Sequence, residues 1–149
     1  MQDPHLHQRI GFQISRLARV MQTRTEAELA PLGLTRLGWV LLLGIGVDGI
    51  DRPSELARYT GITRPSISRA LRRLEADGLI ARTDGIETDG RIVRIVLTDH
   101  GREVLEIVRP RMDVVNRHFA DKLQPEERAL LFAALAKLAA GEPDVLTRL

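Results

Sequence analysis

The fold is decided by residues 53–78, which read PSELARYTGITRPSISRALRRLEADG. Two helical patterns meet here at Gly61, where a backbone with positive φ costs glycine little. Ala57 is small enough for a second helix to pass close by, and Ile62 fills the angle between the two helices. The apolar residues that face a core at helical spacing are Leu56, Ile67, Ala70, Leu71 and Leu74. This pattern predicts a helix-turn-helix.

The second of these helices, from about Arg64 to Ala76, has a basic outward face. At 100° per residue, the side opposite Ile67 holds proline, serine and arginine, and residues 63–76 contain four arginines against the single acid Glu75. Arginine grips phosphate or reads guanine edges, and serine bonds to either. The alternative is an ordinary solvated helix face. The residues expected to bind DNA from this helix are Arg64, Pro65, Ser66, Ser68, Arg69, Arg72 and Arg73.

A two-stranded hairpin is predicted next along the chain. Its strands are Leu79 to Arg82 and Ile92 to Leu97, and the turn-rich segment between them contains Asp84-Gly85 and Asp89-Gly90. Arg91 and Arg94 follow the tip, where an arginine can enter a narrow minor groove. The alternative is a surface hairpin with scattered charges. We expect this hairpin to be a wing that contacts DNA through Arg91 and Arg94.

Helices flank the helix-turn-helix and hairpin on both sides. Apolar spacing predicts a long helix from Leu6 to about Leu29, a core helix after Thr35, a helix of about 24 residues after Thr98, and a last helix from Pro125. Threonine is a favourable N-cap, and Thr35, Thr63 and Thr98 each precede a predicted helix. The expected fold is mainly α (α+β), a winged helix-turn-helix with a two-stranded wing between terminal helices.

The terminal helices predict a dimer. A long amphipathic helix at each end, with nothing to cover it, would leave a large apolar stripe exposed in a monomer. Packing against a second copy of the chain in a two-fold symmetric dimer buries that stripe. It also sets the two recognition helices roughly 34 Å apart, about one DNA turn. An intramolecular bundle is the alternative.

Composition limits the other functional classes. The 149 residues suit a single domain, and 20 of the 22 basic residues are arginine, which favours phosphate and guanine recognition or reflects a GC-rich genome. Cysteine is absent, which excludes disulfides, thiolate metal sites and a thiol switch. The N-terminus lacks the form of a secretory signal, and no apolar run is long enough to cross a bilayer. We therefore expect a cytoplasmic protein without a membrane partner.

Histidines and aromatic residues give no catalytic or metal motif. His5 and His7 are two potential ligands that no acid or cysteine cluster completes, and Asp99-His100 lacks a nucleophile motif. We expect no enzyme activity, no cofactor and no metal. Three aromatic residues line an effector pocket or belong to the core: Phe12, Trp39 and Phe119.

The sequence resembles the MarR family of bacterial winged-helix regulators. The matching segments are residues 53–57, 61–69 and 74–80, then Asp89-Gly90-Arg91, Leu97-Thr98 and Gly101. The resemblance implies a homodimer with intertwined terminal helices, recognition helices in major grooves, and repression relieved by a small, often aromatic or phenolic, effector. It also implies that Asp89 orients the wing arginine and that Arg91 reaches the minor groove. The family commonly has Asp-Arg-Arg in the wing, and Gly90 replaces the middle cation.

These observations favour a sequence-specific, ligand-responsive repressor that binds double-stranded DNA as a homodimer. Residues 1–149 are expected to form one MarR-like domain, with dimerisation helices at 5–31 and 99–149 and a winged helix-turn-helix lobe at 34–98. The alternative is a winged-helix module for protein–protein interaction without DNA binding, which would need an apolar outward face on the helix at 64–76.

Overall fold

The computed structural model describes residues 5–87 and 90–146, which form short 3-10 turns, α-helices and one β-hairpin. The elements in chain order are η1 (Leu6–Gln8), α1 (Ile10–Leu29), η2 (Ala30–Leu32), α2 (Arg36–Gly46), α3 (Pro53–Thr60), α4 (Arg64–Ala76), β1 (Ile80–Glu87), β2 (Gly90–Leu97), α5 (Asp99–Ala120) and α6 (Pro125–Ala139). The chain is thus mainly helical with a two-stranded antiparallel sheet, which confirms the predicted fold class.

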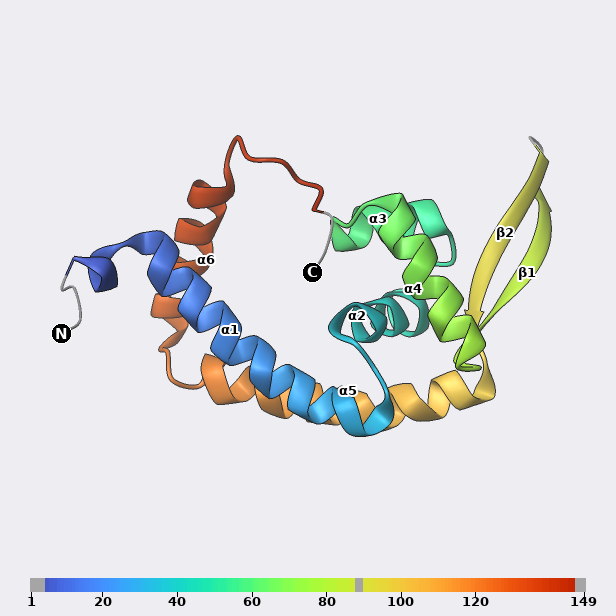
Figure 1. The fold of residues 1–149 in the computed structure, drawn as a ribbon, viewed down its shortest axis with the longest axis horizontal. Coiled ribbons are helices and arrows are strands. Elements are labelled where there is room, and N and C mark those ends of the chain that lie inside the picture. The colour runs from blue at the N-terminus through green and yellow to red at the C-terminus, as the bar shows by residue number, and fades with distance from the viewer. Residues whose placement is uncertain (1–4, 88–89, 147–149) are drawn as a thin grey trace.

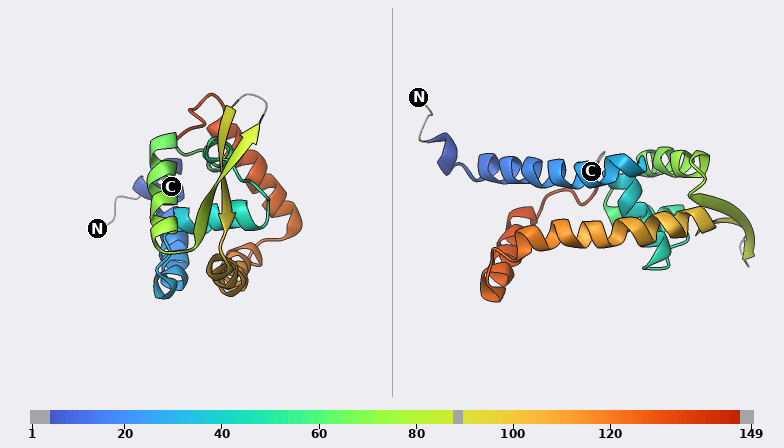
Figure 2. Two further views of the ribbon diagram at one scale, coloured as in Figure 1. Left: turned by 90° about the vertical axis from the view of Figure 1, so that its right-hand side faces the viewer. Right: turned by 90° about the horizontal axis from the view of Figure 1, so that it is seen from below.

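The molecule has a lobe at one end and long helices that extend from it. Figure 1 shows α2, α3, α4 and the β-hairpin gathered in the lobe, with the hairpin projecting outward. Figure 2 shows α1 and α5 running alongside each other away from the lobe, with α6 at their far end. This arrangement separates α4 and the hairpin from the far ends of the terminal helices.

The core lies in the lobe and centres on α2. Leu41 and Leu42 of α2 are fully buried, as are Leu29 at the end of α1 and Leu56 of α3. Burial of a leucine side chain contributes about 1.5–3 kcal/mol. The core extends into α4, the base of the hairpin and the first turns of α5, so it fixes the orientation of α4 and the hairpin relative to α5.

Gly101 in the first turn of α5 allows this helix to approach the base of the hairpin. A Cβ atom at this position would lie 1.9 Å from the carbonyl oxygen of Leu79. The same carbonyl accepts a hydrogen bond from the backbone N–H of Thr98 at 3.1 Å. Only glycine therefore fits where α5 begins.

Two of the three predicted threonine caps form. The hydroxyl of Thr35 accepts from the N–H of Gly38 at 3.0 Å, and that of Thr98 accepts from the N–H of Gly101 at 2.9 Å. Thr63 is the N-cap residue of α4, but its side chain does not cap the backbone. Its hydroxyl instead donates to the Ser66 hydroxyl at 3.1 Å. A local side-chain partner has replaced the expected backbone bond.

The hairpin is longer than the sequence predicted. Asp84 and Gly85 belong to β1, where they pair with Val93 and Ile92, and not to the turn. The register runs from Ile80↔Leu97 to Glu87↔Gly90. The β-branched partners on β2 hold the Asp-Gly dipeptide in an extended ladder, so the wing reaches further from the lobe than expected.

Much of the apolar surface of the terminal helices is uncovered in the single chain. Exposed apolar side chains on α1, α5 and α6 include Ile10, Ile14, Leu17, Val20, Val114, Leu130, Phe132 and Leu138. Within residues 5–87 and 90–146, no single helix is long and apolar enough to cross a membrane. The segments Ile10–Leu32 and Arg36–Gly46 pass that test only together, and they are bent by 74° at the break between them.

Candidate nucleic-acid interface

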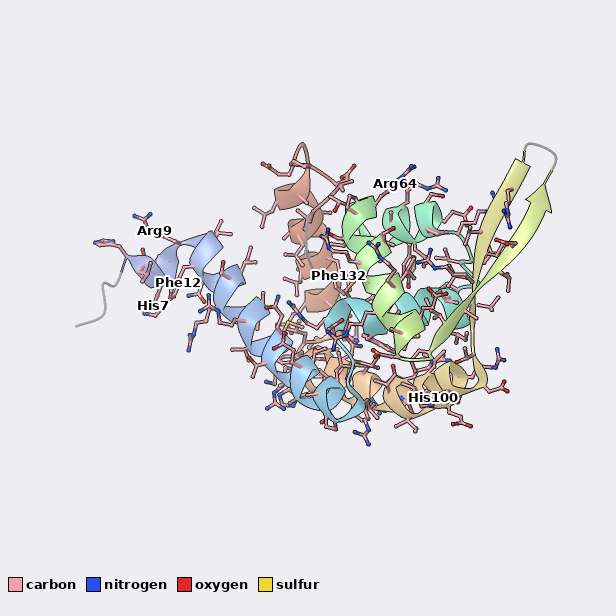
Figure 3. All side chains as sticks on the ribbon, turned by 45° about the vertical axis from the view of Figure 1, so that its right-hand side comes forward. His7, Arg9, Phe12, Arg64, His100 and Phe132 are labelled. Carbon is pink, nitrogen blue, oxygen red and sulfur yellow. The ribbon has the colours of Figure 1, made fainter. Side chains whose placement is uncertain are left out.

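Helix α4 is held by its inward face and presents its arginines outward. Ile67, Leu71 and Leu74 are buried in the core, and three- to four-residue spacing places them on one side of the helix. Figure 3 shows Arg64 at the outer end of this helix, on the side of the lobe away from His100 of α5. The exposed residues of the predicted set are Arg64, Pro65, Ser68, Arg69, Arg72 and Arg73.

Ser66 lies in a different place from the other predicted contacts. Only 9% of its surface is exposed, and its hydroxyl accepts from Arg69 Nη2 at 3.0 Å and from the Thr63 hydroxyl at 3.1 Å. Because the hydroxyl points into this local network, it orients Arg69 and does not project toward solvent. The helical-wheel argument placed Ser66 at the edge of the outward face. In the structure Ser66 is buried on the inner side of the helix.

A basic cleft joins α4 to the wing and to the start of α3. Its volume is about 450 Å³. The cleft brings together Arg64 and Ser68 of α4, Arg91 of β2, and the segment before and at the start of α3; its lining is Arg52, Pro53, Ser54, Arg64, Ser68, Arg91, Ile92 and Val93. Three arginines from three separate segments and two serines line it, and these residue types suit an oxyanion such as a phosphate.

Arg52 and Ser54 are the residues that the sequence argument missed. Arg52 is the N-cap residue of α3, and Pro53 occupies its first position. The unsatisfied N–H groups and the dipole of a helix N-terminus favour an anion, so an Arg-Pro-Ser sequence at a helix start was an available signal. Its proximity to Arg64 and Arg91 could not be read from spacing.

The two wing arginines have different surroundings. Arg91 Nη2 lies 2.7 Å from Asp84 Oδ2 on the neighbouring strand, and both side chains are mostly exposed. Arg94 is half-buried and pairs with Asp51 in the segment before α3. The carbonyl of Asp51 also accepts the N–H of Ile95 at 2.7 Å. Arg94 therefore ties the wing to the lobe, whereas Arg91 faces the cleft. Asp89 lies outside the described residues.

Other charges near α4 are partly neutralised. Arg73 Nε lies 3.8 Å from Asp77 Oδ2, and Arg82 Nε lies 3.1 Å from Glu75 Oε2. Glu75 is the single acid among residues 63–76, and it is therefore paired with Arg82 of the hairpin and not with an arginine of α4. This leaves the outward face around Arg69 and Arg72 cationic.

The aromatic candidates for an effector pocket are dispersed. Trp39 packs against the lobe core. Phe12 lines an open groove of about 370 Å³ along α1, together with Arg16 and Arg19. Phe119 lies near two cations, with Lys122 Nζ 5.4 Å from its ring centroid and Arg24 Cζ at 6.0 Å. The structure does not bring these three rings together into one cavity among its described residues.

Metal-ligating residues do not cluster in the described ranges. No group of three or more histidine or acidic side chains there could hold a metal ion. Desolvation and the nearby cations Arg24 and Lys122 lower the pKa of His118. These cations would also oppose a bound metal ion at His118.

Comparisons with known proteins agree with this fold. Residues 32–92 match the family model described as the MarR family. The fold resembles BpsR of Bordetella bronchiseptica, with a TM-score of 0.79, 20% identity, and coverage of 95% of this chain and 100% of that one. It also resembles CouR of Rhodococcus jostii RHA1 (0.78, 20%, 93% and 97%). A MarR-family transcriptional regulator of Silicibacter pomeroyi is 25% identical, with a TM-score of 0.68 and 92% of each chain covered.

Proposed function

Because this chain belongs to the MarR family of winged-helix transcriptional regulators, we propose that it is a ligand-responsive repressor that binds a pseudo-palindromic operator as a homodimer. The observation that carries the proposal is the basic cleft, which is lined by Arg52 at the N-cap of α3, Arg64 of α4 and Arg91 of β2. Helix α4 enters a major groove, the cleft holds a backbone phosphate, and the wing follows the adjacent minor groove. The rival protein-interaction module would need an apolar outward face on α4, and that face is cationic.

The exposed apolar surface supports the homodimer. Ile10, Leu17, Leu130 and Phe132 are each between 51% and 71% exposed in the single chain. Side chains of this size gain free energy when a second copy covers them. The helices within 5–31 and 99–149 would then form the dimer, and the lobe at 34–98 would read DNA.

Ligands of the structural relatives support an aromatic effector. DNA binding by BpsR is regulated by 6-hydroxynicotinic acid, and CouR was solved with p-coumaroyl-CoA. The organohalide-sensing regulator RdhR-CbdbA1625 was solved with 2,4-dichlorophenol. For this chain we propose an aromatic acid or phenol that shifts the distance between the two recognition helices. Release of bound duplex by members of an aromatic acid and phenol panel would identify it.

Binding to duplexes selected from a random pool tests the DNA proposal. Fluorescence anisotropy at several salt concentrations should show an affinity that falls steeply with salt, because cationic side chains displace counterions from phosphates. Arg52→Ala should weaken binding to all sequences and reduce the slope of log K against log salt by about 0.9. Arg109→Ala, an exposed arginine on α5, is the matched control. Failure of the wild-type protein to bind any duplex in this way would overturn the function and favour the protein-interaction module.

A further inference from the structure

The segment after α6 returns to the helix-turn-helix. We call residues 141–146 the C-terminal strap. Figure 1 shows the strap leaving the end of α6 and crossing to the lobe beside α3. It ends in a parallel β-bridge between Leu146 and Ile62, which lies in the turn between α3 and α4. The strap therefore links the far end of the molecule to the turn that precedes the recognition helix.

Two backbone hydrogen bonds attach the strap to this turn. The N–H of Leu146 donates to the Gly61 carbonyl at 2.6 Å, and the N–H of Thr63 donates to the Leu146 carbonyl at 2.9 Å. Thr63 is the N-cap of α4, and the first N–H groups of a helix have no partner within it. The turn thus offers a donor and an acceptor two residues apart, as the edge of a sheet does.

Gly61 shapes the turn to receive an extended chain. Its φ is +67°, which favours glycine, and a Cβ atom there would lie 2.9 Å from the carbonyl oxygen of Asp144. The strap backbone therefore passes directly over the glycine. A side chain at position 61 would both strain the turn and push the strap away.

The strap carries negative charge to the edge of the basic face. Its sequence is GEPDVL, with two acids and no base, and Glu142 and Asp144 are exposed. The backbone carbonyl of Asp144 lies over Gly61, which precedes Arg64 of the basic cleft by three residues in the sequence.

We propose that the turn formed by residues 61–63 is a docking edge for an extended chain, that the strap of the same chain occupies it, and that the docked strap weakens DNA binding. The last part rests on the proposed function. The docked strap uses the Thr63 N–H, which would otherwise be available to a phosphate oxygen. It also brings a segment with two carboxylates to the start of α4, and a negative segment there opposes a DNA phosphate. Tight DNA binding therefore requires the strap to leave.

Two variants of the whole chain, Leu146→Pro and Leu146→Ala, distinguish the loss of the backbone contact from the loss of the leucine side chain. Proline lacks the N–H that donates to Gly61, whereas alanine keeps both backbone bonds. In hydrogen exchange, the Thr63 amide should exchange at least about tenfold faster in Leu146→Pro than in the wild type or in Leu146→Ala. Unchanged exchange in Leu146→Pro would overturn the docking. Protection that depends on protein concentration, as expected for a strap donated by the second copy, would overturn occupancy by the same chain.

Measurements of DNA affinity test whether the docked strap weakens DNA binding. Leu146→Pro should bind the selected duplex about three- to tenfold more tightly at 0.15 M salt, and Leu146→Ala should match the wild type. The double variant Glu142→Gln/Asp144→Asn should also bind more tightly while Thr63 stays protected, and its gain should shrink at higher salt. Unchanged or weaker binding by Leu146→Pro with a deprotected Thr63 would overturn the restraint. Wild-type protein that binds no duplex would overturn the proposed function and the restraint, whereas exchange at Thr63 would still decide the docking.

Discussion

Ser66 and Arg69 act as a pair on the first turns of α4. The serine hydroxyl is buried and accepts from Arg69 Nη2 at 3.0 Å, so it restricts where the guanidinium can point. A preorganised arginine loses less conformational freedom when it binds a base or a phosphate. The sequence predicts that both residues contact DNA, and from this geometry we propose that Arg69 makes the contact and Ser66 orients it.

Arg69→Ala should weaken operator binding by about 1–3 kcal/mol if the arginine reads a base. Ser66→Ala should weaken it less, because the arginine remains but is no longer held. The double variant should then lose no more than Arg69→Ala alone, since the serine acts through the arginine. Anisotropy titrations of the three variants measure this cycle. Additive losses would instead indicate that Ser66 contacts DNA directly.

At the scale of elements, the wing is positioned by a contact between distant segments. Asp51, before α3, pairs with Arg94 of β2 and accepts the N–H of Ile95. These bonds fix the wing beside the N-terminus of α3, and this position places Arg91 in the cleft with Arg52. The predicted contact residue Arg94 thus has a structural role, and its DNA contact remains a proposal.

Asp51→Ala tests whether Asp51 affects DNA binding by positioning the wing or only through its negative charge. Removal of an acid makes the protein more positive, which by electrostatics alone would tighten DNA binding. If Asp51 positions the wing through a half-buried ion pair, binding should weaken by about 0.5–1.5 kcal/mol. Anisotropy titrations give the sign of the change in DNA affinity, which decides between positioning of the wing and electrostatics alone. A tighter complex would show that the wing does not depend on this contact.

The junction of α5 with the hairpin depends on Gly101. Gly101→Ala should lower the free energy of unfolding by about 1–3 kcal/mol, because its Cβ would overlap the Leu79 carbonyl. Gly11→Ala is the matched control, since nothing lies within 4 Å of a Cβ on this α1 glycine. That variant should be neutral or more stable by up to about 1 kcal/mol. Urea unfolding of both variants measures the difference, and equal stabilities would contradict the close approach.

At the scale of the whole molecule, the basic cleft and the exposed apolar side chains lie on different elements. The lobe carries the basic cleft, whereas α1 and α6 carry exposed apolar side chains such as Ile10, Leu130 and Phe132. A two-fold dimer through the terminal helices would leave both clefts free and hold them at a defined spacing. Oligomeric state and DNA affinity should therefore change together.

Phe132→Asp should convert the dimer to a monomer in analytical ultracentrifugation and weaken operator binding at least about tenfold, because one lobe alone contacts half of the site. Val47→Asp places the same charge on an exposed apolar residue at the end of α2 and should leave the dimer intact. A Phe132→Asp protein that remains dimeric would exclude this part of α6 from the interface.

The sequence by itself determined the elements and the cationic face of α4. Helix periodicity, Gly61 and the threonines before α2 and α5 act within a few residues, so local spacing is enough to predict them. Tertiary structure alone decided the burial of Ser66, the pairing of Asp51 with Arg94, and the cleft that adds Arg52. It also decided that the strap pairs with Ile62 in the turn before α4. Each of these contacts except the Ser66 network joins residues far apart in the chain, and packing of the core sets their distances. A helical wheel gives direction around an axis but not depth, so it placed Ser66 at the edge of the outward face and could not show that Ser66 is buried.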